Sequence, residues 1–189
     1  MCREQLPVWQ QFYSRHKAQG VEVLSVAVDV QGPEKARPFA DKAKPNFPTV
    51  VDQTNLLSRL FGFKAVPNAI FIDERGVIRY AKYGGFDIRK PEFAKIAEQW
   101  AATSSIEGAS ENKLGGADHA KAVALFQKGQ EHYRQGRMGE ALTLWREAVA
   151  LDPDNYVIRK QVWAVENPDK FYAGDVDYAW QRQQMDKGL

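Results

Sequence analysis

The stretch Cys2-Arg3-Glu4-Gln5-Leu6-Pro7 opens the chain and places its single cysteine at the beginning of an amphipathic pattern. Apolar residues recur on one stripe until Gly20, so the spacing predicts a helix from Cys2 to about Ala18. A thiol at a helix start meets the positive end of the helix dipole and unpaired N–H groups, which favour the thiolate. Pro7 lies inside this helix, where a proline is expected to kink the backbone.

Short apolar segments and helical patterns alternate through the next fifty residues. Residues 21–29 form a mostly apolar run ending in Asp29, which is typical of a buried parallel strand. Pro33 suits the first turn of a second helix. A short strand is expected at 49–52, and Asn55 is expected to cap a short helix.

A second group of strand signals begins at Val66-Pro67. Residues 68–73 and 77–83 read as two strands joined by the turn Asp73-Glu74-Arg75-Gly76. A last helix is predicted from apolar residues at helical spacing: Phe93, Ile96, Ala97 and Trp100.

In this order and spacing, residues 1–102 resemble the thioredoxin-like redoxins of the TlpA/ResA type. The signature of that family is W-C-x-x-C-R-x-E-x-P, and Met1 falls on its last residue before the second cysteine. We assign the rest of the signature to Cys2, Arg3, Glu4 and Pro7. Four further elements match the family pattern: the strand 21–29 ending in Asp29, Gly62 to Pro67, Phe71 to Gly76, and the pair Gly84-Gly85.

The resemblance implies a thioredoxin-like α/β domain that carries out thiol–disulfide exchange on protein thiols and disulfides, without a bound cofactor. It makes Cys2 the second, resolving cysteine, with Arg3, Glu4 and Pro7 as supporting residues. It also implies that the Val66–Pro67 bond is cis and that its backbone binds an extended substrate.

This chain departs from the family pattern at its beginning, where the first cysteine and the strand leading into the motif have no counterpart. We therefore expect an incomplete N-terminus and no dithiol reductase activity in this truncated form. Whether the chain is an enzyme depends on that missing segment. A natural short form that lost catalysis and kept the scaffold is the alternative.

Composition restricts the remaining functions. With 189 residues, 44% hydrophobic, 26% charged and a net charge of +2, the chain gives no electrostatic argument for nucleic-acid binding. No apolar run approaches the roughly 20 residues that span a membrane. The histidines lack ligand spacing, so no metal site is predicted. The compartment is open: extracytoplasmic or membrane-tethered if a missing N-terminus carries a signal, otherwise cytoplasmic.

The second half of the chain is predicted to be helical. Residues 103–118 are polar and rich in Gly and Ser, which indicates a flexible linker before a helical domain at 119–189. From Ala122 this all-α domain resembles one tetratricopeptide repeat. The residues at or next to its signature positions are Gly129, Tyr133, Gly136, Ala141, Trp145, Ala148 and Pro153.

One repeat is too small to be stable alone, so the helical domain is expected to need a neighbour. We favour self-association with a second copy over docking on the first domain, which the linker would leave free to move; a protein partner is a further alternative. The last helix is expected to be capped by Asp175. Its large aromatic residues are interpreted as core rather than as a peptide groove: Trp145, Trp163, Phe171, Tyr172, Tyr178 and Trp180.

Two other functions compete with disulfide exchange. A peroxiredoxin-like thiol peroxidase, with Cys2 as the peroxide-reactive thiol, is favoured by the resemblance of Gly20–Val26 to that class, but Pro7 and Val66-Pro67 fit it less well. A non-catalytic binding module would use the helical domain to recruit a partner. Asp29 and Asp73, which end strands, are interpreted as turn residues.

Overall fold

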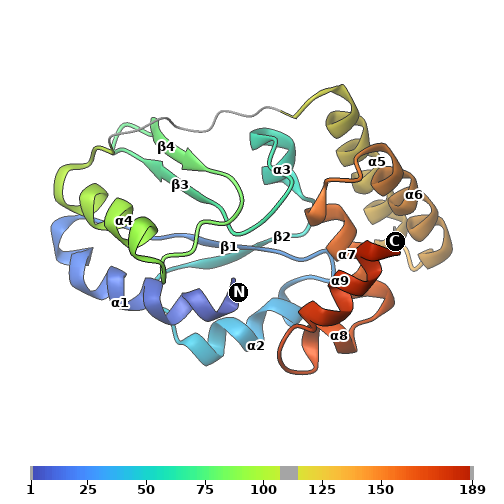
Figure 1. Cartoon of the computed structure of the whole chain (residues 1–189), viewed down its shortest axis with the longest axis horizontal. Coiled ribbons are helices and arrows are strands. Elements are labelled where there is room, and N and C mark those ends of the chain that lie inside the picture. The colour runs from blue at the N-terminus through green and yellow to red at the C-terminus, as the bar shows by residue number, and fades with distance from the viewer. Residues whose placement is uncertain (1, 107–114, 188–189) are drawn as a thin grey trace.

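The computed structural model describes residues 2–106 and 115–187, and it divides them into a mixed α/β N-terminal region (2–106) and a helical region (115–187) (Figure 1). The elements of the N-terminal region are η1 (Arg3–Gln5), α1 (Leu6–His16), η2 (Lys17–Gln19), β1 (Ser25–Val28), α2 (Pro33–Ala43), β2 (Thr49–Asp52), α3 (Leu56–Phe61), β3 (Ala69–Ile72), β4 (Ile78–Lys82) and α4 (Pro91–Thr103). The helical region contains α5 (Ala117–Arg134), α6 (Met138–Leu151), α7 (Tyr156–Glu166), α8 (Asp169–Tyr172) and α9 (Tyr178–Asp186). This is the predicted fold class, α/β followed by all-α.

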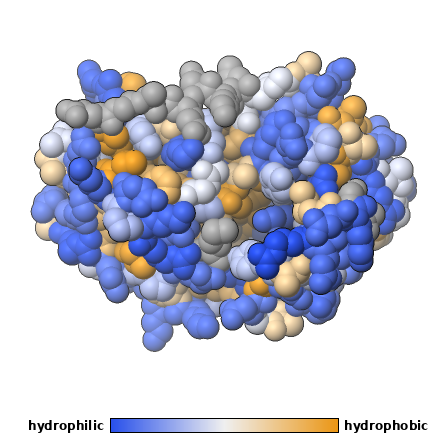
Figure 2. All heavy atoms as spheres, in the orientation of Figure 1, coloured by the Kyte–Doolittle hydropathy of each residue, from blue (hydrophilic) through white to orange (hydrophobic). Residues whose placement is uncertain are grey.

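The strands form two separate pairs. β1 runs parallel to β2 with Ser25 opposite Thr49, and β3 runs antiparallel to β4 with a register shift between Phe71 and Ile72. Within the described residues, β1 and β3 each have one edge without a partner strand. Figure 2 shows the same side of the molecule as Figure 1, and the middle of this side is hollowed and exposes hydrophobic atoms.

The first strand corrects a prediction. Residues 21–29 read as a long buried strand, but β1 covers only Ser25–Val28 and all four residues are half-buried. A parallel strand becomes fully buried when it has neighbours on both edges and helices on both faces. β1 has β2 on one edge alone, so its apolar sequence exceeds the burial that it achieves.

Helices α1 and α4 pack against the β3–β4 pair and form the main hydrophobic core of the N-terminal region. Phe71 of β3 lies at its centre, with ring centroids 5.6 Å from Trp100 and 5.9 Å from Phe86. The buried members are Phe12, Phe71, Tyr80, Phe86, Ile88 and Ala97. This core fixes the start of α1, and with it Cys2, relative to the loop that follows β4.

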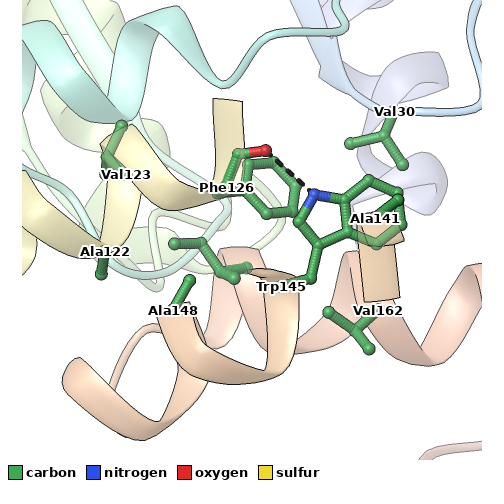
Figure 3. Packing of buried hydrophobic residues seen from close by; sticks show 9 residues of the cluster. Val30, Ala122, Val123, Phe126, Ala141, Trp145, Ala148 and Val162 are labelled. Atoms are coloured by element: carbon green, nitrogen blue, oxygen red, sulfur yellow. Dashed lines mark hydrogen bonds between the residues drawn. The ribbon is translucent and has the colours of Figure 1, made fainter. Parts of the chain in front are cut away.

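In the helical region, α5, α6 and α7 pack around Trp145 (Figure 3). The indole is fully buried, and its Nε1–H donates to the Phe126 carbonyl at 2.9 Å. A Cβ placed on Gly129 would lie 2.5 Å from Trp145 Nε1, closer than real Cβ contacts. Gly129 is therefore the position that lets α5 and α6 approach, as the repeat pattern predicts.

Most of the large aromatic residues pack as core, as interpreted from the sequence. Besides Trp145, Trp163 and Phe171 are buried in a second cluster, with Tyr172 and Trp180 half-buried against it. Tyr178 is the exception, because 37% of its surface is exposed.

The first helix and two helix caps differ from expectation. The helix predicted from Cys2 to Ala18 is divided into η1, α1 and η2, and Gly20 ends it with φ +87°. Asn55 precedes α3, but the Asp52 carboxylate accepts from Leu56 N and Leu57 N, both at 2.9 Å. Asp177 rather than Asp175 caps α9, accepting from Trp180 N at 2.8 Å.

The helical region docks on the N-terminal region. Val30 lies in the same buried cluster as Trp145, and the Gln161 amide bonds to both Val30 N and Val28 O at 2.9 Å. At another point His119 Nδ1 contacts Asp152 Oδ2 at 2.9 Å, and Asp152 also pairs with Lys64. Such contacts oppose the free movement that we expected between the two regions, and they supply a neighbour other than a second copy.

The domain boundaries stay a prediction. α4 extends to Thr103 and α5 begins at Ala117. Half of the predicted linker 103–118, residues 107–114, lies outside the described residues.

Candidate functional site

Cys2 lies immediately before the 3-10 turn η1, and its thiol is exposed. The Cys2 carbonyl accepts from Gln5 N at 3.1 Å, which closes the turn. Pro7 falls in the first turn of α1, where a proline replaces no intrahelical hydrogen bond. The kink predicted at Pro7 is therefore not required, because Pro7 helps to begin α1 instead of interrupting it.

The expectation that the start of the helix favours the thiolate form of Cys2 is wrong. Desolvation by the surrounding protein raises the pKa of the thiol, and the positive charges of Lys160 and Arg3 only partly oppose this. Cys2 as a whole residue is exposed, while protein atoms near its thiol displace part of the surrounding water and so raise the thiol pKa. A helix dipole favours thiolate most beside a full α-helical turn, and Cys2 precedes a three-residue 3-10 turn.

Arg3 and Glu4 point in different directions. The Arg3 guanidinium lies 3.6 Å from the centre of the Phe39 ring and donates to the carbonyls of Phe171 and Gly174 in the helical region. Glu4 is largely exposed and pairs with Arg89 at 2.6 Å. Neither side chain is a simple surface charge, since each ties the cysteine turn to another segment.

Counting from Cys2, the Glu of the family signature falls on Gln5 rather than on Glu4. Gln5 is 2% exposed, and its Oε1 accepts from Ile88 N at 3.1 Å. The inward position is therefore occupied by an amide, and the assignment of Glu4 to the signature is corrected. Glutamine in place of glutamate removes one negative charge from the neighbourhood of the thiol.

The Val66–Pro67 peptide bond is cis, as predicted. The Pro67 carbonyl accepts from Phe86 N at 3.2 Å, and the Asn68 side chain accepts from Gly84 N at 2.6 Å. Val66 is 39% exposed, so the bond lies at an accessible surface.

Residues 84–89 connect the cysteine turn with the cis-proline. Phe86 bonds to Pro67, Ile88 bonds to Gln5, and Arg89 pairs with Glu4. Through this segment the structure holds Cys2, Arg3 and Glu4 and the pair Val66-Pro67 around one loop. Gly84 and Gly85 both have φ +76°, and this left-handed backbone explains the glycine pair.

The two strand-end aspartates have different surroundings. Asp73 accepts from Val77 N and Arg75 N and pairs with Arg79, and these bonds lower its pKa to about 2, as expected of a turn residue. Asp29 also accepts from Gln31 N, but it receives a 2.9 Å bond from the Tyr172 hydroxyl of the helical region. Burial raises the pKa of Asp29.

Across residues 2–106 and 115–187, no group of three or more His, Cys, Asp or Glu side chains is arranged to hold a metal ion. In the same part of the chain, no helix is both long and apolar enough to cross a membrane.

Comparison with known proteins follows the division seen in the fold. The profile of the AhpC/TSA family matches residues 1–81, and that of the tetratricopeptide repeat matches residues 122–155. The chain therefore has an AhpC/TSA redoxin domain at its N-terminus. The helical region contains one tetratricopeptide repeat, built by α5 and α6.

Curated relatives of the redoxin domain are thiol–disulfide oxidoreductases. The ResA protein of Halalkalibacterium halodurans is 32% identical over 85 residues, covering 44% of this chain and 47% of that protein. Sporulation thiol-disulfide oxidoreductase A of Bacillus subtilis is 26% identical over 101 residues, covering 52% and 58%. This chain thus spans about half the length of the curated relatives that it matches. No solved structure matches it significantly.

Sequence reasoning missed two residues beside the thiol. Gln5 was assigned to a variable position, although its buried amide bonds the loop after β4. Lys160 lies far along the chain, in the part that the sequence predicts only to be helical. Its proximity to Cys2 depends on how the two regions dock, and no motif signals that.

Proposed function

We propose that this protein takes part in thiol–disulfide exchange with protein substrates, with Cys2 as the reactive residue. The observation that carries the proposal is the exposed Cys2 immediately before η1 in a redoxin domain. The cis Val66–Pro67 bond is held by the same loop as the cysteine turn, and the exposed Val66 supports a role for this bond as the place where an extended substrate would pair.

The exchange step is a substitution at sulfur. The Cys2 thiolate attacks one sulfur of a substrate disulfide, the substrate S–S bond breaks, and the other substrate sulfur leaves as a thiolate. The product is a mixed disulfide on Cys2, and its release needs a second thiolate. The sequence contains one cysteine, so the 189-residue chain is expected to form this adduct without turning it over.

We also propose that a strand and the first cysteine of the motif precede Cys2 and complete the site. The edges of β1 and β3 that lack a partner strand among the described residues support this. A strand inserted between these edges would join the two pairs into one sheet. An upstream reading frame encoding an apolar strand that ends in Trp-Cys plus one residue before Met1 is expected. An in-frame stop codon directly before Met1 would contradict it.

The adduct is the first test of function. The purified chain is incubated with a small peptide disulfide at pH 8.5, and intact mass is measured. We expect one peptide added per chain, no addition to the Cys2→Ser variant, and no catalysis of insulin reduction by dithiothreitol. Absence of an adduct on the folded chain would refute disulfide exchange, whereas catalytic insulin reduction would refute the single-thiol mechanism.

Two other functions give different results in the same laboratory series. Catalytic consumption of hydrogen peroxide with a thiol reductant, lost in Cys2→Ser, would support a thiol peroxidase. Inertness in both assays would support a binding module that uses the helical region, which the tetratricopeptide match favours.

A further inference from the structure

The helical region reaches the cysteine turn through the segment between α8 and α9. Arg3, the residue after Cys2, donates to the Phe171 carbonyl and, at 3.4 Å, to the Gly174 carbonyl. The Phe39 ring below the guanidinium holds the arginine in place. Two backbone carbonyls of the helical region are therefore bound by the residue that follows Cys2 in the sequence.

A second set of contacts holds α7 against the N-terminal region. Gln161 bonds Val30 N and Val28 O at 2.9 Å, which anchors α7 at the end of β1. Gln31 Nε2 donates to the Ala164 carbonyl and to the Tyr172 hydroxyl, both at 3.1 Å. Three of these four hydrogen bonds join a side chain to a backbone atom, so they determine the axial position of α7 as well as its distance from β1.

Lys160 directly precedes Gln161 and is half-buried. Desolvation lowers the pKa of Lys160, and the nearby Cys2 opposes this, while Lys160 in turn lowers the pKa of the thiol. Tyr178 of α9 faces the same thiol: burial, and next the charge of Cys2, raise its pKa. The other charged groups at this face are Arg3, Glu4, Arg89 and Asp175.

We propose that the helical region forms one wall of the thiol site and that Lys160 is a positioning residue that stabilises the Cys2 thiolate. The reasoning is electrostatic. A cation close to a thiolate favours the charged form, and it does so most where water is partly excluded. Lys160 comes from the helical region, so the docking of the repeat would set the reactivity of the redoxin thiol. The inference deepens the proposed function and rests on it.

The test measures thiolate formation directly. The rate of Cys2 alkylation by iodoacetamide is followed by mass spectrometry between pH 6 and 10 for the full chain and for Lys160→Met. We expect a higher thiol pKa in Lys160→Met and alkylation about three- to tenfold slower at pH 7.5, since the thiolate fraction falls tenfold per unit of pKa.

Two further variants serve as controls. Lys160→Arg keeps the positive charge and should restore most of the rate. Lys121→Met removes an exposed lysine of α5 and should leave the profile unchanged. Superimposable profiles for Lys160→Met and the parent chain would overturn the proposal, as would failure of Lys160→Arg to recover the rate.

Loss of folding gives the opposite signal. Protein around Cys2 raises the pKa of its thiol, so unfolding or undocking would return the pKa downward toward its ordinary value. A rise in Lys160→Met is therefore specific to loss of the lysine, and a fall would refute it. Alkylation needs no second cysteine, so this result stands apart from the mixed-disulfide assay, which tests the function itself.

Discussion

Replacing Gly129 by alanine tests the packing of the tetratricopeptide repeat. The added Cβ would lie 2.5 Å from Trp145 Nε1, 2.6 Å from Trp145 Cδ1 and 3.1 Å from the Ala141 carbonyl. The fully buried indole has no free space to enter, and it holds a 2.9 Å bond to the Phe126 carbonyl (Figure 3). The clash must therefore move either the ring or one of the two helices.

The expected magnitude follows from three effects. Overpacking a filled core costs about 1–3 kcal/mol, and loss of the indole hydrogen bond adds about 1 kcal/mol. Alanine in a helix recovers about 1 kcal/mol relative to glycine. Gly129→Ala should therefore lower the free energy of unfolding by about 1–3 kcal/mol.

Urea denaturation followed by circular dichroism at 222 nm measures the change. Gly139→Ala is the matched control, because it lies in α6 and its new Cβ meets nothing within 4 Å. We expect that variant to gain up to about 1 kcal/mol. If Gly129→Ala is as stable as the parent chain, close approach of α5 and α6 is not what Gly129 provides.

Three more predictions concern the turn after β3, the interface and the isolated repeat. Asp73→Asn should lower the free energy of unfolding at pH 7. Because the folded pKa of Asp73 is about 2, the difference in free energy of unfolding between variant and parent should vanish as pH falls from 4 toward 2. A difference in urea denaturation that stays constant with pH would contradict this. Tyr172→Phe removes the donor to buried Asp29 and should lower the free energy of unfolding by about 1–3 kcal/mol. Tyr156→Phe, at an exposed tyrosine, should change the free energy of unfolding little, and equal effects of the two substitutions would refute the interface role of Tyr172. The fragment 119–189 should lack a cooperative thermal transition as a monomer, since Val30 is absent from its core; a sharp, concentration-independent melt by circular dichroism with monomeric sedimentation would refute this.

Much of the fold could be predicted because its signals are local. The order of strands and helices follows from the apolar spacing, and the bulk of Trp145 opposite Gly129 needs only the repeat pattern. The caps were missed because they depend on side-chain reach: Asp52 sits at the end of β2, yet its carboxylate extends to the first turn of α3. The sequence shows a good capping residue at Asn55, but it does not show which side-chain oxygen accepts the hydrogen bonds of the first turn.

The candidate site was predicted only in part. The cis bond and the cysteine at the start of the first helix carry motifs, whereas the raised thiol pKa depends on atoms from the other end of the chain. Gln161 and Tyr172 look like ordinary helix residues in the sequence, and their role appears only when α7 and α8 meet β1. The contact between the two regions produces no periodic pattern in the sequence, so it could not be predicted from the sequence.

The position of Val30 bears on how such chains can be recombined. A repeat is commonly treated as a cassette that can be cut from one protein and fused to another at a linker. Here the side chain that completes the core around Trp145 is contributed by the loop after β1 of the redoxin domain, and the Gln161 amide bonds that loop's backbone. A chimera that fuses this repeat to another protein would need a matching apolar residue in the position of that loop. Without it, the core around Trp145 would be left incomplete.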